Sequence, residues 1–289
     1  MEKIVVVTGG GSGIGKAVAE MLPKEYTVII TGRTASKLEN TAAEMNAKGH
    51  RIVCKSCDVS DRASVRKLAE EAAAMGEVVK VIHCAGISGS MGSSETITRI
   101  NALGTVYVNQ EFYKVMNGGV ICDVASDSGC MLAEQMLPSE ETYALALTDE
   151  AAFVAEMVKK AAITPMEAVN ASVMYMISKN FARWYSRNCA YKYAKNKGIR
   201  VFSVSPGFVK TPMTDAEQGE ATACMLSYSG LERGAEPEEL AFLITMLADD
   251  RCSYLIGTDV MCDGGCVNNG YGMQTSRVRY DGRSAAENW

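Results

Sequence analysis

A tyrosine and a lysine four residues apart are the pair in this sequence best suited to acid–base chemistry. Tyr175 and Lys179 lie in a helical pattern from about residue 171 to 197, and a four-residue step brings two side chains to one helix face. A phenol ordinarily has a pKa near 10, and an adjacent ammonium group lowers it by favouring the phenolate. The spacing predicts a proton donor and acceptor, although such pairs more often combine one exposed and one packed side chain.

The segments around this pair alternate between strand and helix patterns. Apolar runs predict seven strands, at residues 3–7, 26–31, 51–57, 78–83, 120–124, 200–205 and 258–261. Helical patterns lie between several of them, at about residues 16–22, 36–48, 62–75, 95–116 and 171–197. This order predicts a doubly wound α/β fold of the Rossmann type, with a seven-stranded parallel sheet and helices on both faces. We expect a single domain over residues 1–289, since no Gly-, Pro- or Ser-rich linker divides the chain.

A glycine cluster lies between the first strand and the first helix. Residues 9–15 read Gly-Gly-Gly-Ser-Gly-Ile-Gly, and the amides at a helix N-terminus can hold the phosphates of a dinucleotide. A tight turn without a ligand is the simpler alternative, but strand, glycines and helix occur in the order that dinucleotide binding requires. Residues 10–16 also match the start of a nucleotide hydrolase phosphate-binding loop. That match fails at Ala17, where a Ser or Thr should contact Mg²⁺.

Composition and charge argue against several other classes of protein. The 289 residues are 47% hydrophobic and 22% charged with a net charge of −5, which argues against a basic nucleic-acid-binding surface. No apolar segment approaches the roughly 20 residues that span a bilayer, and no secretion signal begins the chain. We therefore expect a soluble, cytoplasmic protein. Its ten cysteines and two histidines show no metal-ligand pattern, and reduced thiols are expected.

In the order of its motifs, the chain resembles the short-chain dehydrogenase/reductase family. Residues 8–15 look like the family's TGxxxGxG fingerprint, and Tyr175 with Lys179 matches its YxxxK pair. The remaining landmarks follow in order: Asp58-Val59, Cys84-Ala85-Gly86 in place of Asn-Asn-Ala-Gly, Asn101, Ser126, and Pro206-Gly207 with Thr211. The resemblance covers about residues 3–265.

This resemblance implies a catalytic tetrad of Asn101, Ser126, Tyr175 and Lys179. Tyr175 is expected to protonate the substrate carbonyl oxygen as hydride reaches carbon. Lys179 is expected to lower the tyrosine pKa and bind the nicotinamide ribose, while Ser126 stabilises the substrate oxygen and Asn101 holds a water that links Lys179 to solvent. Two other hydroxyls, those of Ser128 and Ser172, compete for the role of the serine.

The resemblance also implies a set of cofactor contacts: Gly9, Ser12, Gly13, Ile14, Gly32, Arg33, Asp58, Val59, Cys84, Ala85, Gly86, Tyr175, Lys179, Pro206, Gly207, Val209 and Thr211. An acidic residue at the end of the second strand bonds the ribose hydroxyls of NAD(H) and repels a 2′-phosphate. Gly32 occupies that position here, and the next residue, Arg33, is a planar cation that suits a phosphate. The sequence therefore predicts NADP(H) rather than NAD(H), although a surface arginine in a turn is the simpler alternative.

Between Ser126 and Tyr175 the chain is much longer than the family pattern. A helical insertion is expected at about residues 131–167, with an amphipathic run from Asp149 to Ala162. Its apolar side is predicted to contain Ala152, Val154, Ala155 and Val158. The insertion and a short interval before Asn101 resemble the bacterial 3α-hydroxysteroid dehydrogenase/carbonyl reductase branch. A role in assembly and a surface hairpin without a substrate role are both open.

Apolar side chains also gather after the sixth strand. Met213, Met225, Leu226 and Tyr228 lie in a stretch predicted to be irregular, residues 208–234, on the ligand side of such a sheet. They suit a bulky, weakly polar substrate. We expect an oxidoreductase that interconverts a secondary alcohol and a ketone, favouring a hydroxysteroid or bile acid. The alternatives are a general carbonyl reductase for smaller ketones or ketoacyl groups, and a cofactor-sensing protein without catalysis.

The family pattern further implies a homo-oligomer, a dimer or a tetramer, because relatives assemble partly through the helix that carries the tyrosine. The polar tail, at about residues 266–289, is either a free end or part of the subunit contact.

Overall fold

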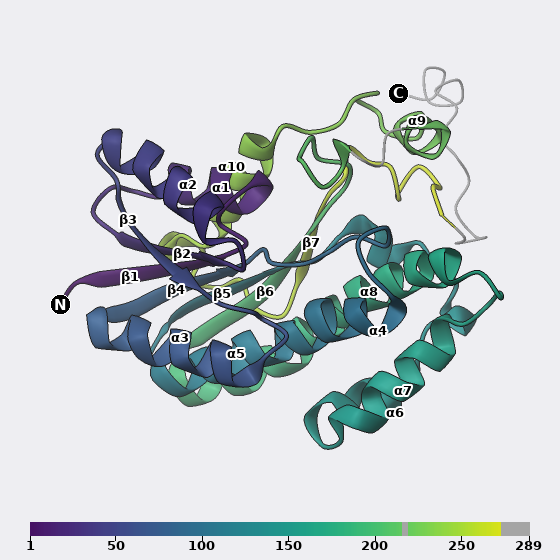
Figure 1. Ribbon diagram of the computed structural model, residues 1–289, viewed down its shortest axis with the longest axis horizontal. Coiled ribbons are helices and arrows are strands. Elements are labelled where there is room, and N and C mark those ends of the chain that lie inside the picture. The colour runs from purple at the N-terminus through teal and green to yellow at the C-terminus, as the bar shows by residue number, and fades with distance from the viewer. Residues whose placement is uncertain (216–218, 273–289) are drawn as a thin grey trace.

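The computed structural model of the protein describes residues 1–215 and 219–272 (Figure 1). Its centre is a parallel sheet of seven strands in the order β3-β2-β1-β4-β5-β6-β7. The strands are β1 (Lys3–Thr8), β2 (Thr27–Gly32), β3 (Arg51–Ser56), β4 (Glu77–His83), β5 (Gly119–Val124), β6 (Ile199–Pro206) and β7 (Asp259–Cys262). The predicted doubly wound α/β fold is confirmed, and every strand lies within one residue of its expected bounds. Most of the predicted tail, from residue 273 on, lies outside the described residues.

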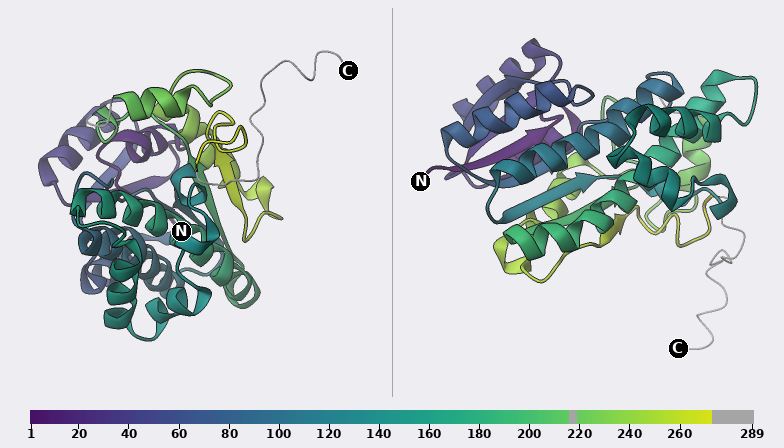
Figure 2. Two further views of the ribbon diagram at one scale, coloured as in Figure 1. Left: turned by 90° about the vertical axis from the view of Figure 1, so that its right-hand side faces the viewer. Right: turned by 90° about the horizontal axis from the view of Figure 1, so that it is seen from below.

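Helices cover both faces of the sheet, as parallel strands require. One face carries α1 (Gly13–Met21), α2 (Ala35–Ala47) and α10 (Pro237–Leu247); the other carries α3 (Arg62–Met75), α5 (Gly104–Val115) and α8 (Glu167–Lys197) (Figures 1 and 2). A short helix, α4 (Ser94–Ile97), continues through a π-helical turn (Thr98–Leu103) into α5.

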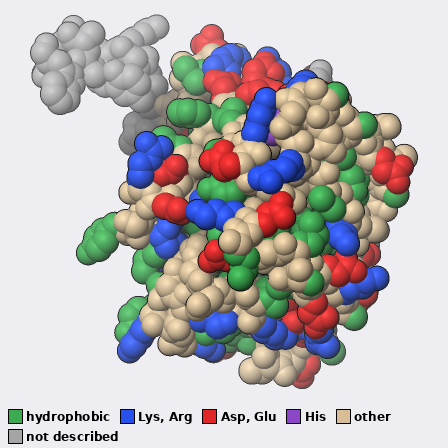
Figure 3. Space-filling model, turned by 90° about the vertical axis from the view of Figure 1, so that its left-hand side faces the viewer, with side chains coloured by type: hydrophobic (Ala, Val, Ile, Leu, Met, Phe, Trp, Pro, Cys, Tyr) green, Lys and Arg blue, Asp and Glu red, His purple; other side chains and the backbone are tan. Residues whose placement is uncertain are grey.

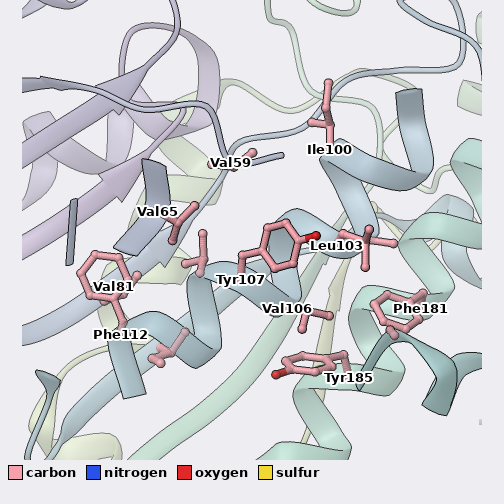
Figure 4. Packing of buried hydrophobic residues seen from close by; sticks show 14 of the residues in the cluster. Val59, Val65, Val81, Ile100, Leu103, Val106, Tyr107, Phe112, Phe181 and Tyr185 are labelled. Atoms are coloured by element: carbon pink, nitrogen blue, oxygen red, sulfur yellow. The ribbon is translucent and has the colours of Figure 1, made fainter. Parts of the chain in front are cut away.

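Alternating side chains along the strands build a core on each side of the sheet. In β1, Ile4 and Val6 pack into one hydrophobic cluster, and Val5 and Val7 pack into the other. All four are fully buried, so the strand reads as a continuous apolar run. Figure 4 shows the larger cluster, where side chains of α3, α5 and α8 meet below the sheet.

Several helices differ from the sequence prediction. The strand and helix pattern does not predict α10, although Glu236 and Glu239 form a reciprocal capping box at its start and Pro237 lies in its first turn. The stretch predicted to be irregular contains α9 (Glu220–Leu226). Helix α8 begins at Glu167, four residues before its predicted start.

The insertion forms two helices that pack against α8 and against the α4–α5 unit. They are α6 (Glu140–Ala144) and α7 (Glu150–Ala161), joined by a 3-10 turn. The buried side chains of α7 are Phe153, Val154, Met157 and Ala161. The predicted apolar side is therefore wrong in part: Val154 is buried, but Ala155 is exposed and Ala152 and Val158 are only partly buried. The large ring of Phe153 gains most from burial and turns that side inward.

The surface and the cysteines are ordinary for this fold. On the face drawn in Figure 3, acidic and basic side chains are interspersed, and neither sign forms a continuous area. None of the described helices has the length and apolar character to cross a membrane. All ten cysteines lie in the described residues and are free thiols. Within residues 1–215 and 219–272, no group of three or more His, Cys, Asp or Glu side chains could hold a metal ion.

Candidate active site

A crevice opens at the carboxyl ends of β1 and β4. These strands are neighbours, but the chain proceeds from β1 to β2 on one side and from β4 to β5 on the other. Loops that leave neighbouring strands in opposite directions diverge and leave room for a ligand. Two adjoining cavities occupy the crevice, and both are lined by Gly9, Ser12, Ala85 and Gly86.

Every residue predicted to bind the cofactor lines one of these two cavities. The first is lined by Ser126, Tyr175 and Lys179, and also by Gly9, Ser12, Gly13, Ile14, Cys84, Ala85, Gly86, Pro206, Gly207, Val209 and Thr211. The second is lined by Gly32, Arg33, Asp58 and Val59. Segments from six strand ends thus meet along one edge of the sheet.

The glycine loop leaves space where side chains would otherwise lie. Gly9 and Gly13 have φ of +69° and +53°, a region that favours glycine. A Cβ on Gly9 would lie 3.0 Å from the backbone nitrogen of Ala85, and one on Gly15 would lie 2.5 Å from the carbonyl oxygen of Gly9. The N-terminus of α1 is therefore open to a ligand, and its positive dipole end suits a pyrophosphate. The residues present fit a dinucleotide.

Tyr175 and Lys179 lie one turn apart on α8 and reach the same cavity. The Lys179 Nζ atom is 5.8 Å from the centre of the Tyr175 ring and donates a hydrogen bond of 3.0 Å to the carbonyl oxygen of Val124. This bond to the end of β5 fixes the amine beside the tyrosine. Burial lowers the pKa of Lys179 to about 8, because desolvation disfavours the charged amine.

Ser126 lies just beyond β5 and is the best placed of the three candidate serines. Its hydroxyl is buried, donates to Asp127 Oδ1 at 3.1 Å and accepts from the backbone N–H of Ser128 at 3.2 Å. Neither competitor lines the cavity. The Ser128 hydroxyl donates to Asp127, and that of Ser172 donates to the carbonyl of its own preceding helical turn.

Asn101 lies behind the cleft rather than in it. Its side chain accepts from the backbone N–H of Ile87 and donates to the Ile87 carbonyl, both at 2.9 Å, and it donates to the Ser178 hydroxyl at 3.1 Å. These bonds hold the loop after β4 against α8. Asn101 belongs to the π-helical turn, a feature that is frequent at functional sites. Its role toward a water molecule stays a prediction.

Two buried ionisable groups near Tyr175 and Lys179 belong to no sequence motif. Asp123, on β5, accepts from Asn109 at 2.9 Å and from a serine hydroxyl of α8 at 2.7 Å, and burial raises its pKa to about 7. His83, on β4, bonds the Thr8 hydroxyl at 2.8 Å, and burial lowers its pKa to about 3. Both side chains point inward from strands that are buried on both faces. The only sequence signal for their burial is the alternation of side-chain direction along a strand.

Lys37 is a further cation that the sequence motifs miss. It lies in the first turn of α2 and lines the second cavity with Arg33, and both side chains are exposed. The carboxylate in that lining, Asp58, is turned to its own loop, where Oδ1 accepts from the N–H and the hydroxyl of Ser60 at 2.9 and 2.7 Å. Proximity to Arg33 in the chain is the signal that could have found Lys37.

The predicted substrate-facing residues separate into two groups. Met213 lines the first cavity with Tyr175. Met225 and Leu226 line a third cavity, which has Asp127 and Gly207 in its wall. The ring of Tyr228 packs on Tyr271, with centroids 5.4 Å apart. Of the four, only Met213 reaches the cavity that contains Tyr175.

Comparison with known proteins adds two family models and several relatives. A model described as short chain dehydrogenase matches residues 3–139, and one described as enoyl-(acyl carrier protein) reductase matches residues 142–267. The short-chain dehydrogenase/reductase bsc3 of Alternaria brassicicola is 26% identical, over 92% of this chain and 97% of its own. The cis-4-hydroxycyclohexanecarboxylate dehydrogenase of Sinomonas cyclohexanicum is 27% identical, over 91% of this chain and 96% of its own.

The fold also matches solved structures. A short-chain type dehydrogenase/reductase from Mycobacterium ulcerans is similar with a TM-score of 0.73 at 23% identity, and the match covers 92% of this chain and 89% of that one. The similarities in sequence and in structure therefore extend over nearly the same length of chain.

Proposed function

Because this chain belongs to the short-chain dehydrogenase/reductase family, we propose that it is an NADP(H)-dependent oxidoreductase that interconverts a secondary alcohol and a ketone. The observation that carries the proposal is the meeting of Ser126, Tyr175 and Lys179 in one cavity of the crevice. The nicotinamide, when bound, supplies or accepts the hydride. We also propose that the chain forms one cofactor-binding domain, with the insertion as part of it.

Tyr175 is the general acid and base in this proposal. In reduction its phenol O–H gives a proton to the carbonyl oxygen, and in oxidation the phenolate takes a proton from the alcohol. Lys179, fixed by its bond to Val124, places positive charge beside the ring and favours the phenolate. The Ser126 hydroxyl orients the substrate oxygen and stabilises the negative charge that develops on it.

The choice of NADP(H) rests on the second cavity. No carboxylate follows β2, since Gly32 occupies that position, and Arg33 and Lys37 both line the cavity. A 2′-phosphate is attracted by two cations, and a guanidinium can bind it through two parallel hydrogen bonds.

For the substrate, we propose a hydroxysteroid or bile acid, as in the bacterial 3α-hydroxysteroid dehydrogenase/carbonyl reductase branch. The insertion before α8 and the apolar Met213, which lines the same cavity as Tyr175, support a bulky ring alcohol. A general carbonyl reductase for smaller ketones is the second candidate. It is favoured by the relative from Sinomonas cyclohexanicum, whose name gives a compact hydroxycyclohexane as its substrate. A catalytically silent cofactor sensor has no need for the pair Tyr175 and Lys179.

We further propose a homo-oligomer. On α10, Phe242 is 63% exposed and Met246 is 44% exposed, and large apolar side chains on a surface often mark a contact between proteins.

Replacing Tyr175 by phenylalanine tests the proposal. The ring remains but the proton donor is lost, so we expect kcat to fall by about 10²- to 10⁴-fold with little change in NADPH affinity. The assay follows NADPH absorbance with ketosteroids, oxo bile acids and simple ketones, and fluorescence titration measures NADPH binding. The matched control is Tyr191→Phe, because Tyr191 is an exposed tyrosine of the same helix. Appreciable turnover by the Tyr175→Phe enzyme contradicts the assignment.

A further inference from the structure

We propose that Asp127 is a positioning residue for Ser126, and that its carboxyl group must be neutral before the serine hydroxyl can donate to the substrate oxygen. This inference rests on the role proposed for Ser126 above. The proposal involves two protons. Tyr175 transfers one to the substrate, and Asp127 holds the other next to the cavity, where the reaction does not consume it.

The geometry around the serine oxygen carries the first step. A hydroxyl has one proton and two lone pairs. The Ser126 oxygen accepts from the backbone N–H of Ser128 at 3.2 Å, and its proton is directed to Asp127 Oδ1 at 3.1 Å. An ionised carboxylate only accepts hydrogen bonds, and it binds a hydroxyl proton more strongly than a neutral ketone does. With Asp127 ionised, the serine proton therefore stays on the carboxylate side.

A neutral Asp127 reverses this hydrogen bond. The carboxylic acid can donate its own proton to the Ser126 oxygen, which then accepts two hydrogen bonds, one from Asp127 and one from Ser128. The serine proton is left for the substrate oxygen in the cavity that Ser126 lines. The reaction stays balanced, because the carbon gains hydride, the oxygen gains the Tyr175 proton, and the protons of Ser126 and Asp127 remain where they are.

The surroundings of Asp127 favour the neutral form. The side chain is 2% exposed, and its Oδ2 atom has no hydrogen-bond partner among the described residues. A buried carboxylate oxygen without a partner is unfavourable when charged. The pKa of Asp127 is raised to about 7, mainly by burial; the hydrogen bonds from Ser126 and Ser128 oppose this rise, and nearby Asp263 contributes to it.

The other charged groups near Asp127 do not reverse this effect. The third cavity, which Asp127 lines, also has Arg233 and Glu239 in its wall, and these two pair with each other at 2.7 and 2.8 Å. Asp263 accepts from the N–H groups of Gly265 and Val267. Among the described residues, Cys262 and Cys266 also line this cavity, and Cys130, Cys266 and Tyr271 interact electrostatically with Asp127.

The test compares the pH dependence of ketone reduction by the wild-type enzyme and by Asp127→Asn. In the wild type we expect kcat/KM to fall roughly tenfold per pH unit above about 7. The asparagine N–H can donate to Ser126 at every pH, so this decline should be absent between about pH 6 and 8. Glu238→Gln, an exposed carboxyl group of α10, is the control and should keep the wild-type profile. An unchanged profile in Asp127→Asn overturns the inference.

A second variant and a spectroscopic measurement test the inference even if the Asp127→Asn protein does not fold. Asp263→Asn removes a negative charge near Asp127 and should move the decline to lower pH; no movement contradicts the inference. Because the pKa of buried Asp123 is also raised to about 7, infrared difference spectra are recorded on Asp123→Asn. Independently of activity, they should still show a buried protonated carboxyl band that is lost with a midpoint near pH 7, and its absence at pH 5 overturns the inference.

These results separate the two proposals. If Tyr175→Phe is inactive while Asp127→Asn keeps the wild-type pH profile, only the role of Asp127 fails. If Tyr175→Phe remains active, the proposed function fails, and the positioning role of Asp127 fails with it.

Discussion

At the level of single residues, Arg33 and Lys37 illustrate how two exposed cations can set cofactor choice. Both line the cavity next to the end of β2, where an acidic residue would select NAD(H). An exposed cation is well hydrated and contributes little to the stability of the fold. Its main contribution is expected when it meets a phosphate, since charge-assisted hydrogen bonds are the stronger ones.

Replacing Arg33 by alanine should therefore affect one cofactor far more than the other. We expect kcat/KM for NADPH to fall roughly 10- to 100-fold, the loss of one charge-assisted contact, and kcat/KM for NADH to change less than about twofold. Adding Lys37→Ala should deepen the NADPH loss. Lys192→Ala, an exposed lysine of α8, is the control. Equal losses for the two cofactors, or a wild-type preference for NADH, contradict this prediction.

The candidate residues that the sequence could place in the fold are those whose positions follow from local rules. Tyr175 and Lys179 share a helix face because of their four-residue spacing, and Ser126 lies just after a strand that an apolar run predicts. The relation of Asp127 to the third cavity is different, because that cavity is formed with Met225 and Cys266. No pattern in one segment indicates which distant segments will meet it.

At the level of elements, the insertion supports the helix that carries Tyr175 and Lys179. The Phe153 ring of α7 packs on Phe181 of α8 with centroids 5.0 Å apart, and Phe181 follows Lys179 by two positions. The Tyr143 hydroxyl donates to Asn180 at 2.8 Å, and Asn180 donates to the carbonyl of Gly129 at 2.8 Å. The insertion is therefore linked through α8 to the loop that contains Ser126.

Replacing Phe153 by alanine should destabilise the protein strongly, because the side chain is fully buried and its removal leaves a cavity between α7 and α8. We expect a loss of about 3–5 kcal/mol in the free energy of unfolding, measured by urea denaturation. Glu156→Ala, on the exposed side of the same helix, should change it by less than about 0.5 kcal/mol. Similar small losses for both variants would show that α7 does not share the core of α8.

At the level of the whole molecule, the interior holds ionisable groups that respond to pH in opposite directions. The pKa values of Asp123 and Asp127 are raised to about 7, so their contribution to stability is lost as pH rises toward 7. His83 has its pKa lowered to about 3. The unfolded chain then binds the proton first, and stability is lost as pH falls from about 6.5 toward 3.

A His83→Asn variant isolates the histidine contribution, because the two aspartates are present in both proteins. Between pH 7 and pH 4 the free energy of unfolding of the wild type should fall by about 3 kcal/mol more than that of the variant. Urea denaturation at several pH values measures the difference. His50→Asn is the matched control, since His50 is far less buried and should give a much smaller difference. Parallel pH curves for wild type and His83→Asn contradict the prediction.

The distribution of the thiols gives this protein a built-in attachment point. Of the ten cysteines, only Cys224, on α9, is exposed, while the others are buried or partly buried, and burial raises the pKa of the cleft thiol Cys84 to about 12. Thiol reagents act on accessible thiolates, so a fluorescent dye added in equimolar amount should attach to Cys224 first. A dye on Cys224 would thus lie on a helix beside the third cavity, with no cysteine introduced by mutation. Its fluorescence could follow ligand binding over time.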